Sequence, residues 1–186
     1  MVFRYKVTLA GIKGFHRIYD INGDSSLYTF HRQLQSDLEL PQDQLIVFKA
    51  LDAGGGVVGR YGLFDLGSGT VDKITVRSTV AAGIASFVYF YDVANKKSVR
   101  ITLEGEEEDA VVDADSPVLV DSKGPEPLAF ENGYVAYEDL PEEVRNPLHG
   151  GAGERDDEDD LEDDEDEEDD DDDEEGEVIY DGSESF

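Results

Sequence analysis

The sequence predicts an α+β fold, in which a mixed sheet carries one main helix packed on one of its faces. Three observations indicate it. Apolar residues alternate in two early stretches, recur with helical spacing in the stretch that follows, and alternate again in the segment 86–104. That last segment reads as two strands joined by a turn at 94–97. Its first strand is apolar on both faces, which is typical of the middle of a sheet.

The first hairpin and the helix follow from the spacing of apolar residues. Alternation over 3–9 predicts a half-buried strand, and 15–21 returns as a second strand, so we expect an antiparallel pair. Ser26 is a favourable N-cap residue, and Pro41 ends the helix that begins after it. The apolar stripe of this helix has spacings of three, four and four: Leu27, Phe30, Leu34 and Leu38.

The remaining elements are less regular. The apolar run 45–51 has the length of a strand, whereas 73–80 is ambiguous between a strand and a short helix ending near Gly83. Between them, 54–69 is a glycine-rich excursion. It holds an apolar cluster that can pack back onto the core: Tyr61, Leu63, Phe64 and Leu66. The element order β-β-α-β-β is similar to a β-grasp arrangement.

Charge divides the chain of 186 residues, whose net charge is −31. From Glu154 to Glu177 there are 21 acidic residues and one Arg. Such a run repels itself and buries almost no apolar surface, so disorder is expected. We therefore predict three parts: an α+β domain over 1–148 with its core at about 3–105 and a wrapping segment over 106–148, a disordered acidic low-complexity tail over 149–177, and a short C-terminal segment over 178–186.

Composition narrows the functional classes. The chain has no Cys, which excludes disulfides, thiolate metal sites and a Cys nucleophile. The N-terminal sequence lacks the features of a signal peptide, and no apolar run has the roughly 20 residues that span a bilayer. We expect a cytoplasmic protein without membrane contact. The negative charge disfavours direct nucleic-acid binding, because that affinity comes largely from Lys and Arg.

No catalytic or metal-binding pattern is present. The three histidines, His16, His31 and His149, are too far apart for a zinc signature, and we interpret them as structural or exposed. No Gly-x-Ser-x-Gly elbow occurs, and no Gly-Lys-Ser/Thr follows the glycine-rich excursion. Tyr89 and Tyr91 could form an aromatic binding face, but a core strand is the preferred interpretation. The sequence thus predicts no cofactor, no metal and no enzymatic activity.

Several short motifs appear in a characteristic order along the first two thirds of the chain. They are Lys6-Val7-Thr8-Leu9, Phe15-His16-Arg17-Ile18, Ser26-Leu27-Tyr28-Thr29-Phe30-His31, the strand and turn 87–95, and Pro117-Val118-Leu119-Val120 with Gly124. This order resembles the plasmid pRiA4b ORF-3-like family, and the acidic tail resembles its members from the Bacteroides group. The resemblance covers roughly 3–135. It implies an α+β fold, no established activity and a mobile-element context.

The acidic run and the residues after it give the strongest functional signal. Tyr180 and Phe186 place aromatic rings after a stretch with almost no apolar residues. An acidic arm ending in aromatics is similar to the tails of single-stranded-DNA-binding proteins, whose terminal Phe docks into partners. We predict a non-enzymatic interaction module. Its folded body binds a protein partner, and its tail, with Tyr180 and Phe186 as partner-binding residues, engages a basic surface or mimics nucleic acid.

Other interpretations of the sequence stay open. The acidic run could serve only to keep the chain in solution. A mobile-element accessory protein that acts on or near nucleic acid is the alternative that the resemblance supports. A small enzyme with an unrecognised site, for example around His31, Asp92 and Asp20, is the third.

Overall fold

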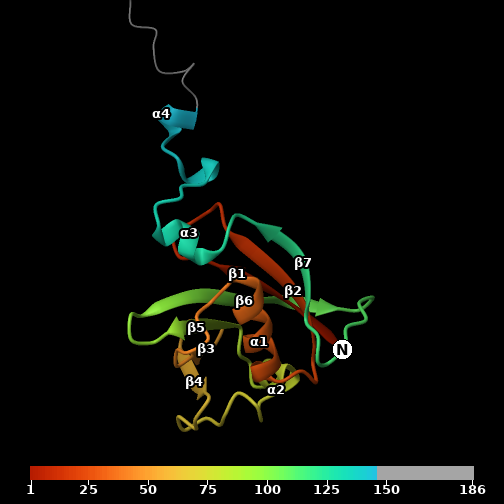
Figure 1. The fold of residues 1–186 in the computed structure, drawn as a ribbon. Coiled ribbons are helices and arrows are strands. Elements are labelled where there is room, and N and C mark those ends of the chain that lie inside the picture. Colours follow the sequence, from red (N-terminus) through yellow and green to blue (C-terminus); the bar gives the residue numbers. More distant parts are fainter. Residues whose placement is uncertain (146–186) are drawn as a thin grey trace, which may run out of the picture. The chain divides into compact units, whose positions relative to one another are not determined.

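The structure, a computed structural model, describes residues 1–145. In these residues seven strands form one sheet in the order β4-β3-β5-β6-β1-β2-β7, and all neighbouring strands are antiparallel (Figure 1). The elements in chain order are β1 (Val2–Thr8), β2 (His16–Asn22), α1 (Leu27–Asp37), β3 (Val47–Leu51), β4 (Val57–Gly62), α2 (Val76–Ala81), β5 (Ser86–Asp92), β6 (Lys97–Glu107), β7 (Val118–Lys123), α3 (Pro127–Glu131), the 3-10 turn η1 (Tyr137–Asp139) and α4 (Glu142–Arg145).

Two hairpins form the middle of the sheet. β1 pairs with β2, with Tyr5 directly opposite Tyr19, and β5 pairs with β6, with Tyr89 opposite Val99. The long strand β6 also pairs with β1, so the two hairpins join into one four-stranded unit. The predicted hairpins are confirmed.

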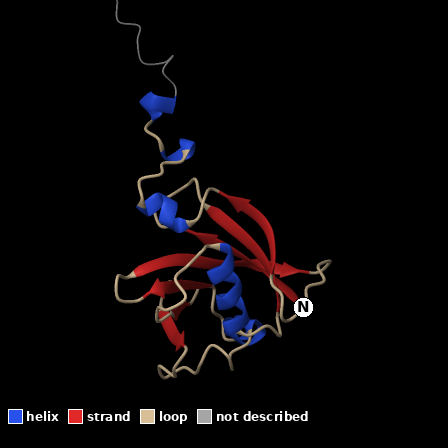
Figure 2. Cartoon of the chain, in the orientation of Figure 1, coloured by secondary structure: helices blue, strands red, loops and turns tan. Residues whose placement is uncertain are grey.

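Helices α1 and α2 begin side by side and lie on one face of the sheet (Figure 2). The Ser26 hydroxyl accepts the backbone N–H of Thr29 at 3.0 Å, and Thr75 caps α2 in the same way at Ser78. An antiparallel bridge joins Ser26 to Thr75. The two helix N-termini therefore hold each other in place.

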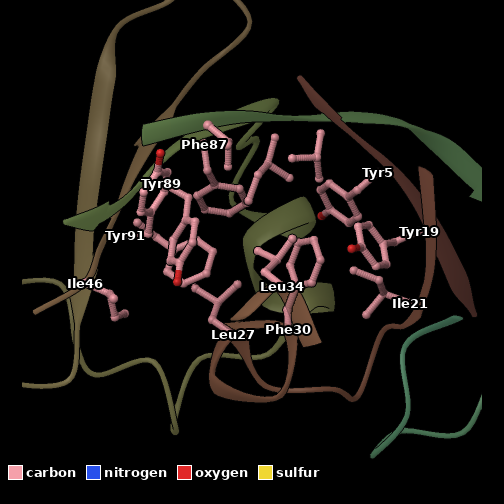
Figure 3. Close-up of a cluster of buried hydrophobic side chains, with 14 of the residues drawn as sticks. Tyr5, Tyr19, Ile21, Leu27, Phe30, Leu34, Ile46, Phe87, Tyr89 and Tyr91 are labelled. Carbon is pink, nitrogen blue, oxygen red and sulfur yellow. The ribbon is translucent and has the colours of Figure 1, made fainter. Parts of the chain in front are cut away.

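The core lies between α1 and the sheet face that it covers (Figure 3). Phe30 of α1 packs edge-on against Tyr19, with ring centroids 5.6 Å apart, and touches Tyr5 at 5.9 Å. On the other side of α1, Phe48 stacks near Tyr89 at 4.6 Å. These aromatic pairs follow from the alternation of the strands, which turns every second residue toward the helix.

The predicted β-β-α-β-β, β-grasp-like mixed sheet with one main helix is wrong. The structure has seven antiparallel strands and, among residues 1–145, four short helices. The two strands that the prediction lacked stand at the edges: β4 comes from the glycine-rich excursion and β7 from the wrapping segment. Edge strands are held largely by main-chain hydrogen bonds, so β7, whose residues are mostly exposed, has no apolar alternation to reveal it.

A buried cation adds to the main-chain hydrogen bonds that hold strand β7 to the sheet. The guanidinium of Arg17 donates to the carbonyl oxygens of Lys123 at 2.7 Å and Gly124 at 2.9 Å, and Arg17 is only 7% exposed. Gly124 has a φ of +76°, and a Cβ there would collide with the carbonyl oxygen of Gly14. The turn after β7 thus packs directly on the turn between β1 and β2.

Two of the predicted parts lie outside the described residues, namely the acidic tail over 149–177 and the C-terminal segment over 178–186. In the part of the chain that is described, no helix is long and apolar enough to cross a membrane.

Candidate functional site

The sequence-suggested residue His31 is buried in the core. It is 5% exposed, and its Nδ1 lies 2.7 Å from the hydroxyl of Tyr89. Burial, aided by the charge of Arg32, lowers the pKa of His31 to about 4. The ring is neutral at pH 7 and acts as a packing partner for Tyr89, as expected for a histidine at the edge of the helix stripe.

The two carboxylates suggested with His31 have other tasks. Asp20 accepts two hydrogen bonds from the Arg4 guanidinium, at 2.7 and 2.8 Å. Asp92 accepts the side chain and the backbone N–H of Asn95, and these bonds lower the pKa of Asp92. No hydrogen bond within residues 1–145 joins His31, Asp20 and Asp92 to one another. In the same residues, no three His, Cys, Asp or Glu side chains form a group that could hold a metal ion.

The tyrosines of β5 do not form a binding face. Tyr89 is 0% and Tyr91 5% exposed, and burial raises the pKa of both phenols. The hydroxyl of Tyr91 donates to Glu131 of α3 at 3.2 Å. Their role is core packing.

The glycine-rich loops are closed by their own carboxylates. Asp52 Oδ1 accepts the N–H groups of Gly54 at 2.9 Å and Gly56 at 2.7 Å. Asp65 Oδ1 does the same for the N–H groups of Gly67 and Gly69. A phosphate cradle needs such N–H groups to be free, so these loops are turns, as the sequence indicated.

The remaining sequence candidates are either paired or not described. His16 on β2 contacts Asp121 of β7 at 2.7 Å, which adds a link between these two strands. His149, Tyr180 and Phe186 lie outside the described residues.

Sequence reasoning missed an apolar groove at the end of β3 and β4. We name the groove by its lining residues: Leu45, Ile46, Val47, Gly62, Leu63, Phe64, Leu66 and Val93. Its volume is about 200 Å³. Phe64 is 72%, Leu45 60% and Leu66 50% exposed. Exposed apolar side chains that cluster around one depression are candidates for an interaction site, whereas single exposed ones are ordinary.

The possibility that the whole cluster 61–66 packs on the core is therefore wrong for three of its four members. Tyr61 does face the core from β4, where it pairs with Phe48. Leu63, Phe64 and Leu66 follow the end of that strand, where the turn capped by Asp65 directs the chain away from the core. Their apolar character was a visible signal, but a sequence does not show whether such a cluster is covered.

A row of cations borders the groove. Lys49 stands between buried Phe48 and Ala50, so its side chain is on the sheet face opposite the core. The register places Lys49 of β3 directly opposite Arg60 of β4 on one side and Val88 of β5 on the other. Val88 is in turn directly opposite Arg100 of β6. We call Lys49, Arg60 and Arg100 the cationic row. None of them takes part in an ion pair within residues 1–145.

The cationic row reflects an uneven distribution of charge. Residues 1–103 contain twelve basic and nine acidic residues, a net charge of +3, although the whole chain carries −31. Most carboxylates of the chain come after residue 103, in and beyond the last part of β6. The central strands of the sheet therefore present positive charge. The groove and the row together can hold apolar side chains that are flanked by carboxylates.

Comparison with known proteins agrees with the fold described above. No curated protein matches the sequence. Among solved structures, a protein of unknown function, MM3350, from Methanosarcina mazei Go1 is similar, with a TM-score of 0.53 and 16% identity over 70% of this chain and 78% of that chain. At this identity the likeness concerns the fold alone.

The sequence itself matches a family over most of its length. The match to the plasmid pRiA4b ORF-3-like proteins covers residues 1–174, which includes every strand of the sheet. The chain therefore belongs to the family of plasmid pRiA4b ORF-3-like proteins.

Proposed function

We propose that the protein is a non-enzymatic interaction module whose folded body binds a protein partner through the apolar groove. The observation that carries this proposal is the exposure of Phe64, Leu45 and Leu66 around one apolar depression. Keeping such side chains in water is unfavourable, and covering them with a partner recovers about 25 cal/mol for each Å² buried. A few central, well-packed residues carry most of the binding energy of an interface, about 2 kcal/mol or more each, and Phe64 is the candidate for that role here.

The partner segment is one in which apolar residues stand between Asp or Glu. Val47 and Gly62 of the groove are directly opposite each other, and Lys49 and Arg60 form a directly opposed pair two residues further along the same strands. Two residues along a strand span about 7 Å, so both cations lie within reach of carboxylates that flank a peptide in the groove. The apolar contact supplies affinity and the cations supply orientation.

The acidic run adds a second, electrostatic contact in this proposal. Its 21 acidic residues between Glu154 and Glu177 attract a basic surface over about one Debye length, roughly 8 Å at physiological salt. Tyr180 and Phe186 are the residues proposed to touch that partner directly. Support for this part comes from the sequence.

The groove is tested with a fluorescent peptide that has three apolar residues between carboxylates. In anisotropy titrations of the full-length protein, Phe64→Ser is expected to weaken binding at least tenfold, because the central apolar contact is lost. Lys49→Glu is expected to weaken it as well, and to remove part of its salt dependence. Val111→Ser is the matched control, since Val111 is 98% exposed and outside the groove. If the Phe64→Ser variant bound the peptide with the same affinity as the wild type, the groove would not be the binding site.

The acidic run is tested separately in the full-length chain. Replacing its Asp and Glu by Asn and Gln is expected to leave peptide binding in the groove intact. In affinity capture from a lysate over a salt series, the wild type is expected to retain basic proteins at low salt, and this variant is expected not to retain them. If the wild type and the variant retain the same partners at every salt concentration, the acidic run has no part in recognition.

Labelled single-stranded DNA in the same titration tests the alternative role near nucleic acid. A net charge of −31 predicts no measurable binding at physiological salt. Tight binding that weakens with salt would make that alternative the leading one.

A further inference from the structure

A second depression lies on the sheet face opposite the core, beside the cationic row. It has a volume of about 400 Å³ and is lined by the loop after β3 and by residues of β5 and β6: Asp52, Ala53, Gly54, Gly55, Ala85, Ser86, Arg100 and Thr102. We call it the Ser86 pocket. Its volume falls within the range of about 300 to 1,000 Å³ that is typical of small-molecule sites. It shares no lining residue with the apolar groove.

The polar groups of the Ser86 pocket converge through the register of the strands. Ser86 stands directly opposite Thr102 in the β5–β6 pair, so the two hydroxyls are neighbours. Arg100 is two residues before Thr102 and on the same face. Ser86 is only 6% exposed. Within residues 1–145, none of these three side chains makes a hydrogen bond or ion pair with another residue.

Cations flank this set of donors on both sides. Lys6 of β1 is directly opposite Thr102. Lys49 of β3 is two strands away from Arg100, with Val88 of β5 between them. The one carboxylate in the lining, that of Asp52, accepts the N–H groups of Gly54 and Gly56 and so holds the loop in its turn. The pocket therefore offers a guanidinium and two hydroxyls as donors, with two cations beside them, while the carboxylate of Asp52 lies in the lining and that of Glu104 follows Thr102 on the same face of β6.

We propose that the Ser86 pocket binds the phosphate group of a small phosphorylated molecule. A guanidinium donates two parallel N–H groups to a phosphate, and two hydroxyls serve its remaining oxygens. The pocket is larger than a phosphate ion, so the organic part of the ligand lies along Ala53, Ala85 and the glycines of the loop. A small ligand fits this chain better than a nucleic acid does, because repulsion from the net charge of −31 grows with the charge of the ligand.

The test is a set of NMR titrations of the full-length protein with inorganic phosphate, ribose 5-phosphate and ribose at constant ionic strength. We expect amide shifts in 52–55, 85–86 and 100–102 with the two phosphates and none with ribose. Ribose 5-phosphate is expected to bind more tightly than phosphate. Arg100→Gln is expected to weaken both at least tenfold, and Thr102→Val, which keeps the side-chain shape, several-fold.

Two control variants separate this site from other effects. Arg32→Gln removes an exposed cation from α1 and is expected to leave the titrations unchanged. Phe64→Ser alters the apolar groove and is expected to leave them unchanged too, so a failure of the groove proposal leaves this one standing. Equal shifts with sodium chloride, or undiminished binding by Arg100→Gln, would overturn the proposal. Equal affinity for phosphate and ribose 5-phosphate would also overturn it, because the ligand would then be the inorganic ion alone.

Discussion

At the residue scale, two polar side chains of the core are paired, whereas the buried hydroxyl of Tyr19 has no hydrogen-bond partner within residues 1–145. His31 and Tyr89 approach from α1 and β5, and their 2.7 Å contact satisfies both in a region that excludes water. Arg17 likewise directs its guanidinium to carbonyl oxygens at the end of β7. Each of these side chains therefore fixes the relative position of two elements.

The buried state of His31 predicts a pH dependence of stability. Its folded pKa of about 4 lies below the value near 6.5 expected in the unfolded chain, so the unfolded chain binds the proton first as pH falls. The free energy of unfolding therefore decreases through the window from 6.5 to 4. Between pH 7 and pH 5 the wild type is expected to lose about 1 to 2 kcal/mol more than His31→Gln.

Urea denaturation of both proteins at the two pH values measures this difference, because all other titrating groups are common to them. NMR titration of the folded wild type gives a second readout, with the His31 midpoint near pH 4. A midpoint above 6, or parallel losses of stability in the two proteins, would contradict the prediction.

At the element scale, the two helices depend on each other at their first residues. The backbone N–H of Leu27 donates to Ile74, and that of Val76 donates to Ser25, both at 2.9 Å. A helix leaves its first N–H groups without partners, and here each helix start supplies acceptors to the other. The short helix α2 is held in this way although six residues form no stable helix alone.

Removing the cap of α1 tests this arrangement. Ser26→Ala takes away the acceptor for the N–H of Thr29 and is expected to cost about 1 kcal/mol of unfolding free energy. Ser36→Ala, an exposed position near the end of the same helix, is the control and is expected to be neutral or slightly stabilising. Urea denaturation compares the two. An equal effect at both positions would mean that the cap contributes nothing.

At the scale of the whole molecule, apolar residues serve two purposes that the structure separates. Phe30 is 1% exposed between Tyr5 and Tyr19, whereas Phe64 is 72% exposed at the groove. Both are phenylalanines in apolar stretches of the same chain. Only their surroundings distinguish a residue that holds the fold from one that is available to a partner.

Substitution of the two phenylalanines is expected to separate stability from binding. Phe30→Ala leaves a cavity in the core and is expected to cost about 3 to 5 kcal/mol. Phe64→Ala is expected to change the free energy of unfolding by less than about 0.5 kcal/mol, as for most surface substitutions. Thermal and urea unfolding of both variants provide the comparison. A large loss of stability in Phe64→Ala would show that the groove residues belong to the core after all.

Local patterns in the sequence were sufficient for the elements that are buried on one face. The alternation in 3–9 and 86–104, the stripe from Leu27 to Leu38 and the cap at Ser26 predicted β1, the β5–β6 hairpin and α1 within a few residues. The motifs that resemble the family lie partly in these stretches and partly in 15–18 and 117–124. Burial against a common core imposes these periods on the residues, so they can be read without the fold.

The edge strands β4 and β7, the apolar groove and the Ser86 pocket were decided only by the tertiary structure. β7 is held largely by main-chain hydrogen bonds, which every residue except proline can both donate and accept and which leave no pattern. Whether Phe64 is covered, and whether Ser86, Arg100 and Thr102 meet, depends on strand register between residues distant in the chain. A sequence by itself therefore determines which residues are favourable to bury. The fold decides which apolar residues are left exposed and which polar groups converge.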